Sequence, residues 1–158
     1  MQNIDLKFMR LAMAKAQEGI SQGQTPFGAC IVKKNKVIAC SHNLVWKSNN
    51  ITAHAEMVAI SSACRALKTI DLSSCTLYST CEPCPMCFSA CHWARISRIV
   101  FGCGIKDARN FGFNEMEVSN LELRRLIKSK IKITSGLLAK ENITLFKFWQ
   151  NQVKAKAY

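Results

Sequence analysis

The sequence predicts a three-layer α/β/α sandwich around a central mixed five-stranded sheet. Three observations predict this fold class. The chain has 158 residues, about the length of one domain. Its hydrophobic fraction of 49% is enough for a packed core and argues against disorder. Its segments alternate between helical and strand patterns in the order αββαβαβαβα, which favours a sheet with helices on both faces. We therefore expect one domain over residues 1–158.

The N-terminal third is predicted to form a helix followed by a β-hairpin. Apolar residues at near-helical spacing indicate a helix over residues 4–22, which Gly19 and Gly23 close. The apolar positions that predict it are Ile4, Phe8, Leu11, Met13 and Ala14. FGACIV (27–32) and VIAC (37–40) follow as short strands, and the polar KKNK between them favours a tight turn.

The remaining elements alternate. AEMVAISSACRAL (55–67) has helical spacing, with Met57, Ile60, Cys64 and Leu67 on one stripe. TLYST (76–80) is typical of a strand, and PMCFSACHWAR (85–95) of a helix, since proline suits a first helical turn. The other predicted elements are a strand at 98–104, a helix at about 119–129, a strand at 131–134 and a helix at about 139–154.

Cysteine content and charge indicate where the protein is located and what it could bind. Nine cysteines, an N-terminus that carries Asp5 and Glu18 in an amphipathic pattern, and no long apolar stretch indicate a cytoplasmic protein without a membrane span. Its cysteines are then core residues or metal ligands. The net charge is +12, and residues 121–158 carry nine Lys/Arg against two Glu. Such a basic region suits either nucleic-acid binding or a solvated helical face.

The stretch TCEPCPMCFSACH holds four cysteines, at positions 81, 84, 87 and 91. This spacing occurs in iron–sulfur proteins, and four thiolates also form closed zinc sites. However, His92 follows the last cysteine where ferredoxins usually have proline, and the segment from Pro85 is patterned as a helix. Cys84 and Cys87 would share one helical face, whereas Cys91 lies about 6 Å further along the axis. The pattern therefore favours Cys84 and Cys87 as the ligands of one metal.

His54 in TAHAEM (52–57) offers a third ligand. H-x-E followed by P-C-x-x-C is typical of zinc-dependent nucleobase deaminases. One imidazole and two thiolates leave the fourth tetrahedral position open, as a catalytic zinc requires. Glu56, two residues after His54, could move a proton from water to the substrate. The sequence thus predicts one Zn²⁺ per chain, held by His54, Cys84 and Cys87, with Glu56 as the catalytic residue.

Further blocks carry a family resemblance that covers most of residues 25–115. TPFGACIV, SHNLV, TAHAEMVAI, LYSTCEPCPMC, ACHWARI and FGFNE occur in the order and spacing of the cytidine/deoxycytidylate deaminase superfamily. Within it, the chain most resembles bacterial-type guanine deaminases, on the blocks PFGA, HWAR and FGFNE and the C-terminal FKFWQNQVKAKAY. The tRNA-specific adenosine deaminases are the next most similar group, because they share the HAE and EPCPMC blocks.

The resemblance implies the cytidine deaminase-like fold, and a pocket that deaminates guanine to xanthine and ammonia. It places six residues around the base: Phe27, Asn43, Ala55, Trp93, Glu115 and Tyr158. The rings of Phe27 and Trp93 would sandwich the purine, Glu115 would accept from its N1–H and 2-amino group, and Asn43 would suit its other edge. The pattern here is Asn114-Glu115 where two aspartates are expected.

The resemblance also implies a homodimer, in which the segment of about 139–158 crosses to the partner subunit and brings Tyr158 near the base. Alternative substrates are the adenosine of a tRNA, or another free base or nucleoside such as cytosine or guanosine. A tRNA substrate would draw on the basic C-terminal region and would flip its target base into the same pocket.

Overall fold

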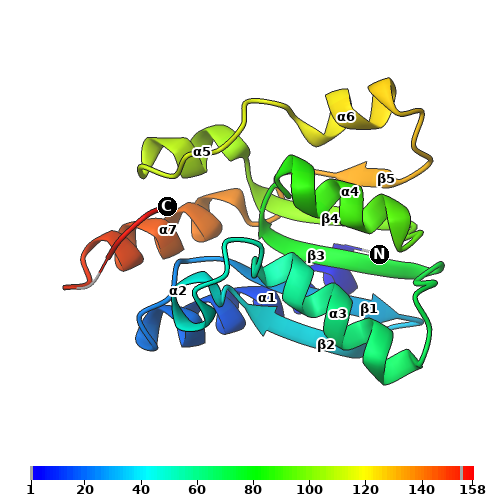
Figure 1. Ribbon diagram of the computed structural model, residues 1–158, viewed down its shortest axis with the longest axis horizontal. Helices are drawn as coiled ribbons and strands as arrows, with labels where there is room; N and C mark the ends of the chain where they lie inside the picture. The colour runs from blue at the N-terminus through cyan, green and yellow to red at the C-terminus, as the bar shows by residue number, and fades with distance from the viewer. Residues whose placement is uncertain (1, 154) are drawn as a thin grey trace.

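Five strands form one mixed sheet in a computed structural model that describes residues 2–153 and 155–158 (Figure 1). The strands are β1 (Gly28–Lys33), β2 (Lys36–His42), β3 (Cys75–Cys81), β4 (Arg98–Cys103) and β5 (Lys132–Thr134). Their spatial order is β2-β1-β3-β4-β5. β1 runs antiparallel to β2 and β3, whereas β3, β4 and β5 run parallel. The predicted mixed five-stranded sheet is confirmed.

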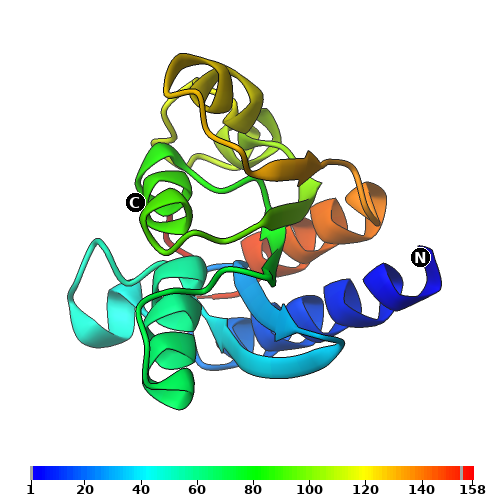
Figure 2. The ribbon, with the colours of Figure 1, turned by 90° about the vertical axis from the view of Figure 1, so that its right-hand side faces the viewer.

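Helices cover both faces of this sheet, as the edge-on view shows (Figure 2). One face carries α3 (Ala55–Leu67) and α4 (Pro85–Trp93), and the other carries α1 (Gln2–Ser21) and α7 (Ala139–Gln150). The connections hold α2 (Val45–Ser48), α5 (Ile105–Asn110) and α6 (Asn120–Leu126). The three-layer class is thus confirmed, while α2 and α5 are short helices that the sequence patterns did not predict. Within the described residues, no helix is long and apolar enough to cross a membrane.

The β1–β2 hairpin turns at Lys34 and Asn35, inside the predicted KKNK turn. Both residues have positive φ, 46° and 60°. This pair of left-handed residues gives a turn whose twist matches that of the two strands, and asparagine tolerates the conformation. The turn fixes the hairpin register, and with it which side of the sheet each side chain of β2 faces.

The buried face of α1 differs from the predicted stripe. Phe8, Ala12, Ala16 and Ile20 are buried at i, i+4 spacing, whereas the predicted Leu11 is 37% exposed. Small residues, Ala12 and Ala16, occupy the middle of this face because the helix lies very close to β1, where a side chain on Gly28 would overlap the carbonyl oxygen of Ala12. The spacing of large apolar residues predicts the stripe, but close packing against β1 requires alanine at the centre of the buried face.

Small residues also form the most buried positions of α3. Its most buried apolar residues are Ala55, Ala59 and Ala63, while the predicted stripe of Met57, Ile60, Cys64 and Leu67 is only partly buried. Alanine lets the helix approach the sheet closely, and the larger residues fill the margins. This approach brings the first turn of α3 to the carboxyl end of β3, where the predicted metal ligands lie.

Candidate zinc site and base cavity

The start of α4 presents two of the predicted ligands. β3 ends at Cys81, and α4 begins at Pro85 in its first turn with Cys84 as the N-cap residue. Cys87 lies one turn further and is fully buried. Proline suits this position because the first N–H groups of a helix have no partner inside the helix. The same free N–H groups and the helix dipole favour thiolates at Cys84 and Cys87.

His54 reaches the same point from the other helix. It is the N-cap residue of α3, and its Nδ1 lies 3.6 Å from Sγ of Cys84 and 3.7 Å from Sγ of Cys87. All three ligand atoms lie within 4.8 Å of one another. Ligand atoms at zinc–nitrogen and zinc–sulfur bond lengths around a tetrahedral ion lie about 3.5–3.8 Å apart. The distances and the donor types therefore fit one Zn²⁺.

The electrostatics of this cluster favour ligands that are ready for a cation. A hydrogen bond from the Cys87 thiol, followed by contact with His54, lowers the pKa of the Cys84 thiol to about 4, although burial opposes this. The same hydrogen bond and burial raise the pKa of the Cys87 thiol. Cys84 thus already favours the thiolate that metal binding needs, and a cation would favour the thiolate of Cys87 as well.

Glu56 lies beside this cluster with little solvent access. Its side chain sits in the first turn of α3 and is only 4% exposed. Ser79 of β3 donates a 3.0 Å hydrogen bond to Oε1, and Oε2 lies 3.7 Å from Sγ of Cys87. Burial raises the pKa of Glu56 above its ordinary value. The carboxylate is therefore held by Ser79 at a fixed position within reach of a reacting group at the metal cluster.

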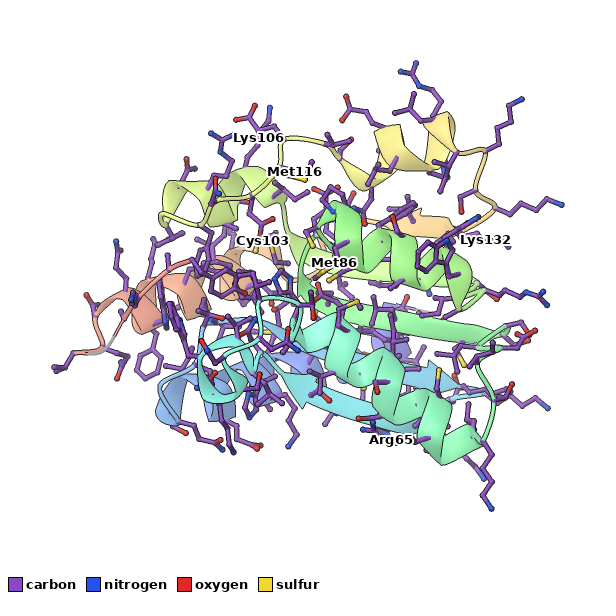
Figure 3. All side chains as sticks on the ribbon, in the orientation of Figure 1. Arg65, Met86, Cys103, Lys106, Met116 and Lys132 are labelled. Atoms are coloured by element: carbon purple, nitrogen blue, oxygen red, sulfur yellow. The ribbon has the colours of Figure 1, made fainter. Side chains whose placement is uncertain are left out.

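A cavity of about 250 Å³ opens onto the metal cluster. It is lined by residues of four segments: Ile51, His54, Cys84, Pro85, Met86, Asn114, Glu115, Met116 and Tyr158. Met86 of α4 and Met116 from the connection after α5 are labelled in Figure 3. Glu115, one of the predicted base contacts, brings a carboxyl group into it. Burial, followed by the charge of Cys84, raises the pKa of Glu115 to about 7.

The end of the chain closes one side of this cavity. The Tyr158 ring lies 5.6 Å from the ring of His54, and its hydroxyl accepts a 2.6 Å hydrogen bond from Nδ2 of Asn43. Asn43 is fully buried and is itself fixed, because its Oδ1 accepts from the N–H of Val45 at 3.0 Å. Asn43 and Tyr158 are each predicted as base contacts, and the structure brings them together although 115 positions separate them.

Residues that the sequence did not mark as functional hold the C-terminal tail, which is residues 155–158. The indole of Trp46 donates a 2.9 Å hydrogen bond to the carbonyl oxygen of Lys156. The N–H of Asn114 donates a 3.0 Å hydrogen bond to the carbonyl oxygen of Tyr158, and the ring of Phe113 packs edge-on against Tyr158 at 5.6 Å. In the sequence, the block SHNLV ends directly before Trp46, and the block FGFNE contains Phe113 and Asn114, but neither indicates a contact with residues 155–158.

Four predicted base contacts do not line the cavity. The first of them, Asn43, lies behind Tyr158 and contacts its hydroxyl group. Phe27 is 8% exposed and packs in the core, with its ring 4.9 Å from that of Phe113. Trp93 is 81% exposed at the last residue of α4, about 13 Å along the helix from Cys84. The two rings therefore do not sandwich a base within one chain. Ala55 is fully buried between His54 and Glu56.

Comparison with known proteins identifies the family to which this chain belongs. The family model described as "Cytidine and deoxycytidylate deaminase zinc-binding region" matches residues 2–103, more than half of the chain. The chain belongs to this deaminase family. Membership makes it a hydrolytic aminohydrolase, and it confirms the family resemblance that the motifs indicated. The matched region contains His54, Glu56, Cys84 and Cys87, but not Glu115 or Tyr158.

Individual relatives of this deaminase extend further along the chain. The guanine deaminase of Bacillus subtilis (strain 168) is 36% identical over 152 residues, which cover 96% of this chain and 97% of the relative. A tRNA-specific adenosine deaminase of Buchnera aphidicola subsp. Schizaphis graminum is 37% identical, over 88% of this chain and 89% of the relative. The solved structure of guanine deaminase from Nitrosomonas europaea superposes with a TM-score of 0.86 at 27% identity, over 93% of this chain and 85% of that chain.

Proposed function

We propose that this deaminase hydrolyses guanine to xanthine and ammonia with one Zn²⁺ per chain. The observation that carries this proposal is the position of the Glu115 carboxyl in the cavity that His54 and Cys84 also line. A carboxylate there suits a ring that presents parallel donors, as guanine does through N1–H and its 2-amino group. The relative from Bacillus subtilis, a guanine deaminase, aligns over 152 of the 158 residues, a span that includes the position of Glu115.

Base recognition would rest on Glu115 and on the C-terminal tyrosine. Tyr158 presents its ring beside His54, and Asn43 orients it through the hydroxyl group. In this arrangement Asn43 acts behind the tyrosine, because both ends of its amide already bond to protein groups. Met86 and Met116 add polarisable walls that adapt to a flat ring.

The zinc would be held by the imidazole of His54 and the thiolates of Cys84 and Cys87. Zinc bound there would lower the pKa of a water molecule and so supply the nucleophile. Glu56 would take one proton from the attacking water and pass it to a ring nitrogen. It would then move the second proton, from the added hydroxyl group, to the leaving amine. Its hydrogen bond from Ser79 leaves Oε2 directed toward the cluster, which is the position a proton carrier needs.

The test is to incubate zinc-loaded protein with guanine and to follow the ultraviolet change to xanthine. The blank is Glu56→Gln, which we expect to keep its zinc and its fold. Its kcat should fall by about 10²- to 10⁴-fold, which is the contribution of general acid–base catalysis. No turnover of guanine by protein that holds one zinc would reject the proposed substrate. Unchanged turnover by Glu56→Gln would reject the role of Glu56.

A tRNA adenosine substrate is the second candidate, because relatives with that activity align over most of the chain. In this structure residues 156–158 lie at one side of the cavity and narrow its entrance. A free base fits such an entrance more easily than a nucleotide that is part of an RNA strand. Salt separates the two candidates. Turnover of a free base should change little between 50 and 200 mM salt, whereas binding of an RNA should weaken steeply.

We further propose that residues 1–158 form one deaminase domain, that it works as a cytoplasmic homodimer, and that the tail crosses between the two subunits. The support for the exchange of tails is that residues 155–158 are at most partly buried and are held by a few hydrogen bonds and ring contacts at the cavity. A tail of the same sequence from a second copy could make the same contacts.

A further inference from the structure

The hairpin at the edge of the sheet carries two cysteines directly opposite each other. Cys30 of β1 pairs in register with Cys40 of β2. The hydrogen-bond phase of the hairpin follows from its open end, where the N–H of Asn43 donates to the carbonyl oxygen of Phe27 at 3.0 Å. Hydrogen-bonded and non-hydrogen-bonded pairs alternate along antiparallel strands. Counting from Phe27 and Asn43, the cysteine pair is a non-hydrogen-bonded one, and the register shifts only beyond Ile31.

This phase brings the two sulfur atoms together. The Cα atoms of a non-hydrogen-bonded pair lie about 4.5 Å apart with their side chains close, which is at the short end of the range that a disulfide spans. Both cysteines point to the α1 side of the sheet, where they pack with Phe8 and Met9. The interaction between the two thiols raises the pKa of Cys30 and lowers the pKa of Cys40.

The pair also divides into an accessible and an inaccessible member. Cys30 is fully buried, whereas Cys40 lines a cavity of about 170 Å³ at the open edge of β2. Lys15 and Glu18 of α1, which form a 2.7 Å ion pair, line the same cavity. The interaction with the Cys30 thiol and, after it, the ammonium of Lys15 lower the pKa of the Cys40 thiol, while burial opposes them. Cys40 is therefore the sulfur that a small oxidant meets.

We propose that Cys30 and Cys40 form a redox-modification site that a hydroperoxide converts into a cross-strand disulfide. The Cys40 thiolate attacks one oxygen of hydrogen peroxide, the O–O bond breaks, and the hydroxide that leaves is protonated to water. The Cys30 sulfur then attacks the resulting sulfenic acid of Cys40. The S–S bond forms as the S–O bond breaks, and a second water leaves. Two thiols are oxidised by two electrons and one peroxide is reduced to two waters.

A second cross-strand pair in the same sheet serves as the contrast. Cys81 of β3 and Cys103 of β4 are also opposite in register, but both are almost fully buried. Each thiol donates to a backbone carbonyl group, Cys81 to Gly104 at 3.5 Å and Cys103 to Thr80 at 3.4 Å. Opposite register alone therefore does not make a reactive pair, and we expect this one to stay reduced.

The experiment treats zinc-loaded protein with hydrogen peroxide at doses that leave its zinc bound, and maps peptides without reduction. The expected product is a cross-linked pair of peptides containing Cys30 and Cys40, which a thiol reductant separates. Cys40→Ser should abolish the cross-link, and Cys64→Ser, which removes another partly exposed thiol, should keep it. Lys15→Met should slow the reaction by up to about tenfold, the change in thiolate population that one pKa unit makes.

A second variant tests the order of the two steps. In Cys30→Ala the sulfenic acid of Cys40 has no resolving partner, so dimedone should label it in this variant and label the wild type several-fold less. The proposal is overturned if peroxide joins Cys81 to Cys103 first, if it oxidises Cys40 while Cys30 stays free in the wild type, or if dimedone fails to label Cys40 in the variant.

Discussion

At the scale of single residues, Glu115 carries most of the proposed choice of substrate. Its carboxyl group is half-buried at the cavity wall, and burial raises its pKa to about 7. A carboxylate accepts hydrogen bonds from both donors of the guanine edge, whereas adenine offers an acceptor at N1 where guanine has N1–H. Glu56, beside the proposed zinc ligands, would carry out the proton transfers, and Glu115 would determine which base is bound.

We expect Glu115→Gln to lower kcat/KM for guanine about 10- to 100-fold, because hydrogen bonds to a charged group contribute roughly 1.5–3 kcal/mol. The measurement is steady-state kinetics with guanine. Glu117→Gln is the matched control, since Glu117 lies two residues away, 59% exposed and paired with Arg109. Equal effects of the two variants, or none from Glu115→Gln, would contradict the role of Glu115 in binding the base.

At the scale of elements, a hydrogen-bonded network joins α1 to the edge between β4 and β5. Arg98 of β4 donates to both carboxylate oxygens of Asp5, at 3.0 and 2.9 Å, and Tyr78 donates to Asp5 at 2.6 Å. Arg98 also donates to Thr134 of β5 at 3.0 Å. This network holds the first turns of α1 against the sheet, on the face opposite the metal cluster.

Asp5→Asn should destabilise the protein by roughly 1.5–3 kcal/mol at pH 7, because Arg98 loses its charged partner. Burial alone would raise the pKa of Asp5, but the Arg98 and Tyr78 hydrogen bonds outweigh it and lower the pKa. The carboxylate therefore stabilises the fold above the unfolded pKa of about 3.8, and this contribution is lost as the pH falls through the lower folded value. Urea unfolding from pH 7 to pH 2.5 measures it. Asp71→Asn, at an exposed pair with Arg95, should change little. A difference between Asp5→Asn and the wild type that does not shrink as the pH falls below 3.8 would contradict the assignment.

At the scale of the whole molecule, the proposed zinc would join α3 to α4 across the end of the sheet. His54 begins α3 and Cys84 begins α4, so one ion would fix the relative position of two helices that share one face. A ligand that binds only the folded state raises its stability by mass action.

Removal of zinc by a chelator should therefore lower Tm by roughly 5–10 °C relative to protein in a hundredfold excess over Kd, given 2–4 °C per kcal/mol for this size. Zinc should restore Tm and magnesium should not, because thiolate and imidazole ligands do not suit magnesium. The readout is a thermal scan of Cys84→Ser beside the wild type. If the chelator left the Tm of the wild type unchanged, zinc at these three residues would not stabilise the fold.

The proposed exchange of tails makes a prediction about mixed dimers. Glu56→Gln lacks the proton carrier, and a chain that ends before residue 155 lacks Tyr158, so each should be inactive alone. If the tail crosses between subunits, co-refolding the two chains should restore activity at one site of each mixed dimer. No recovery from dimers confirmed to be mixed would show that each tail serves its own chain, as in the contacts between Tyr158 and Asn43 described above.

Local sequence patterns are sufficient to predict the metal cluster and the layered fold of this protein. The spacings H-x-E and P-C-x-x-C placed His54, Cys84 and Cys87 at the first turns of two helices, and the structure brings these three residues together. Alternation of strand and helix patterns determined the layered fold. Such patterns are readable because helical and strand periods are local, and because a ligand at a helix start keeps its position relative to its neighbours.

The set of distant residues that share the cavity follows from the packing of the whole chain and is not visible in the sequence. Phe27 and Trp93 have the chemistry of base contacts, but packing sends Phe27 into the core and the length of α4 carries Trp93 away from the site. Tyr158 has no local pattern that directs it to Asn43, and Trp46 none that directs it to Lys156. The path of a long connection depends on the whole of the packed core, so no period along the chain records it.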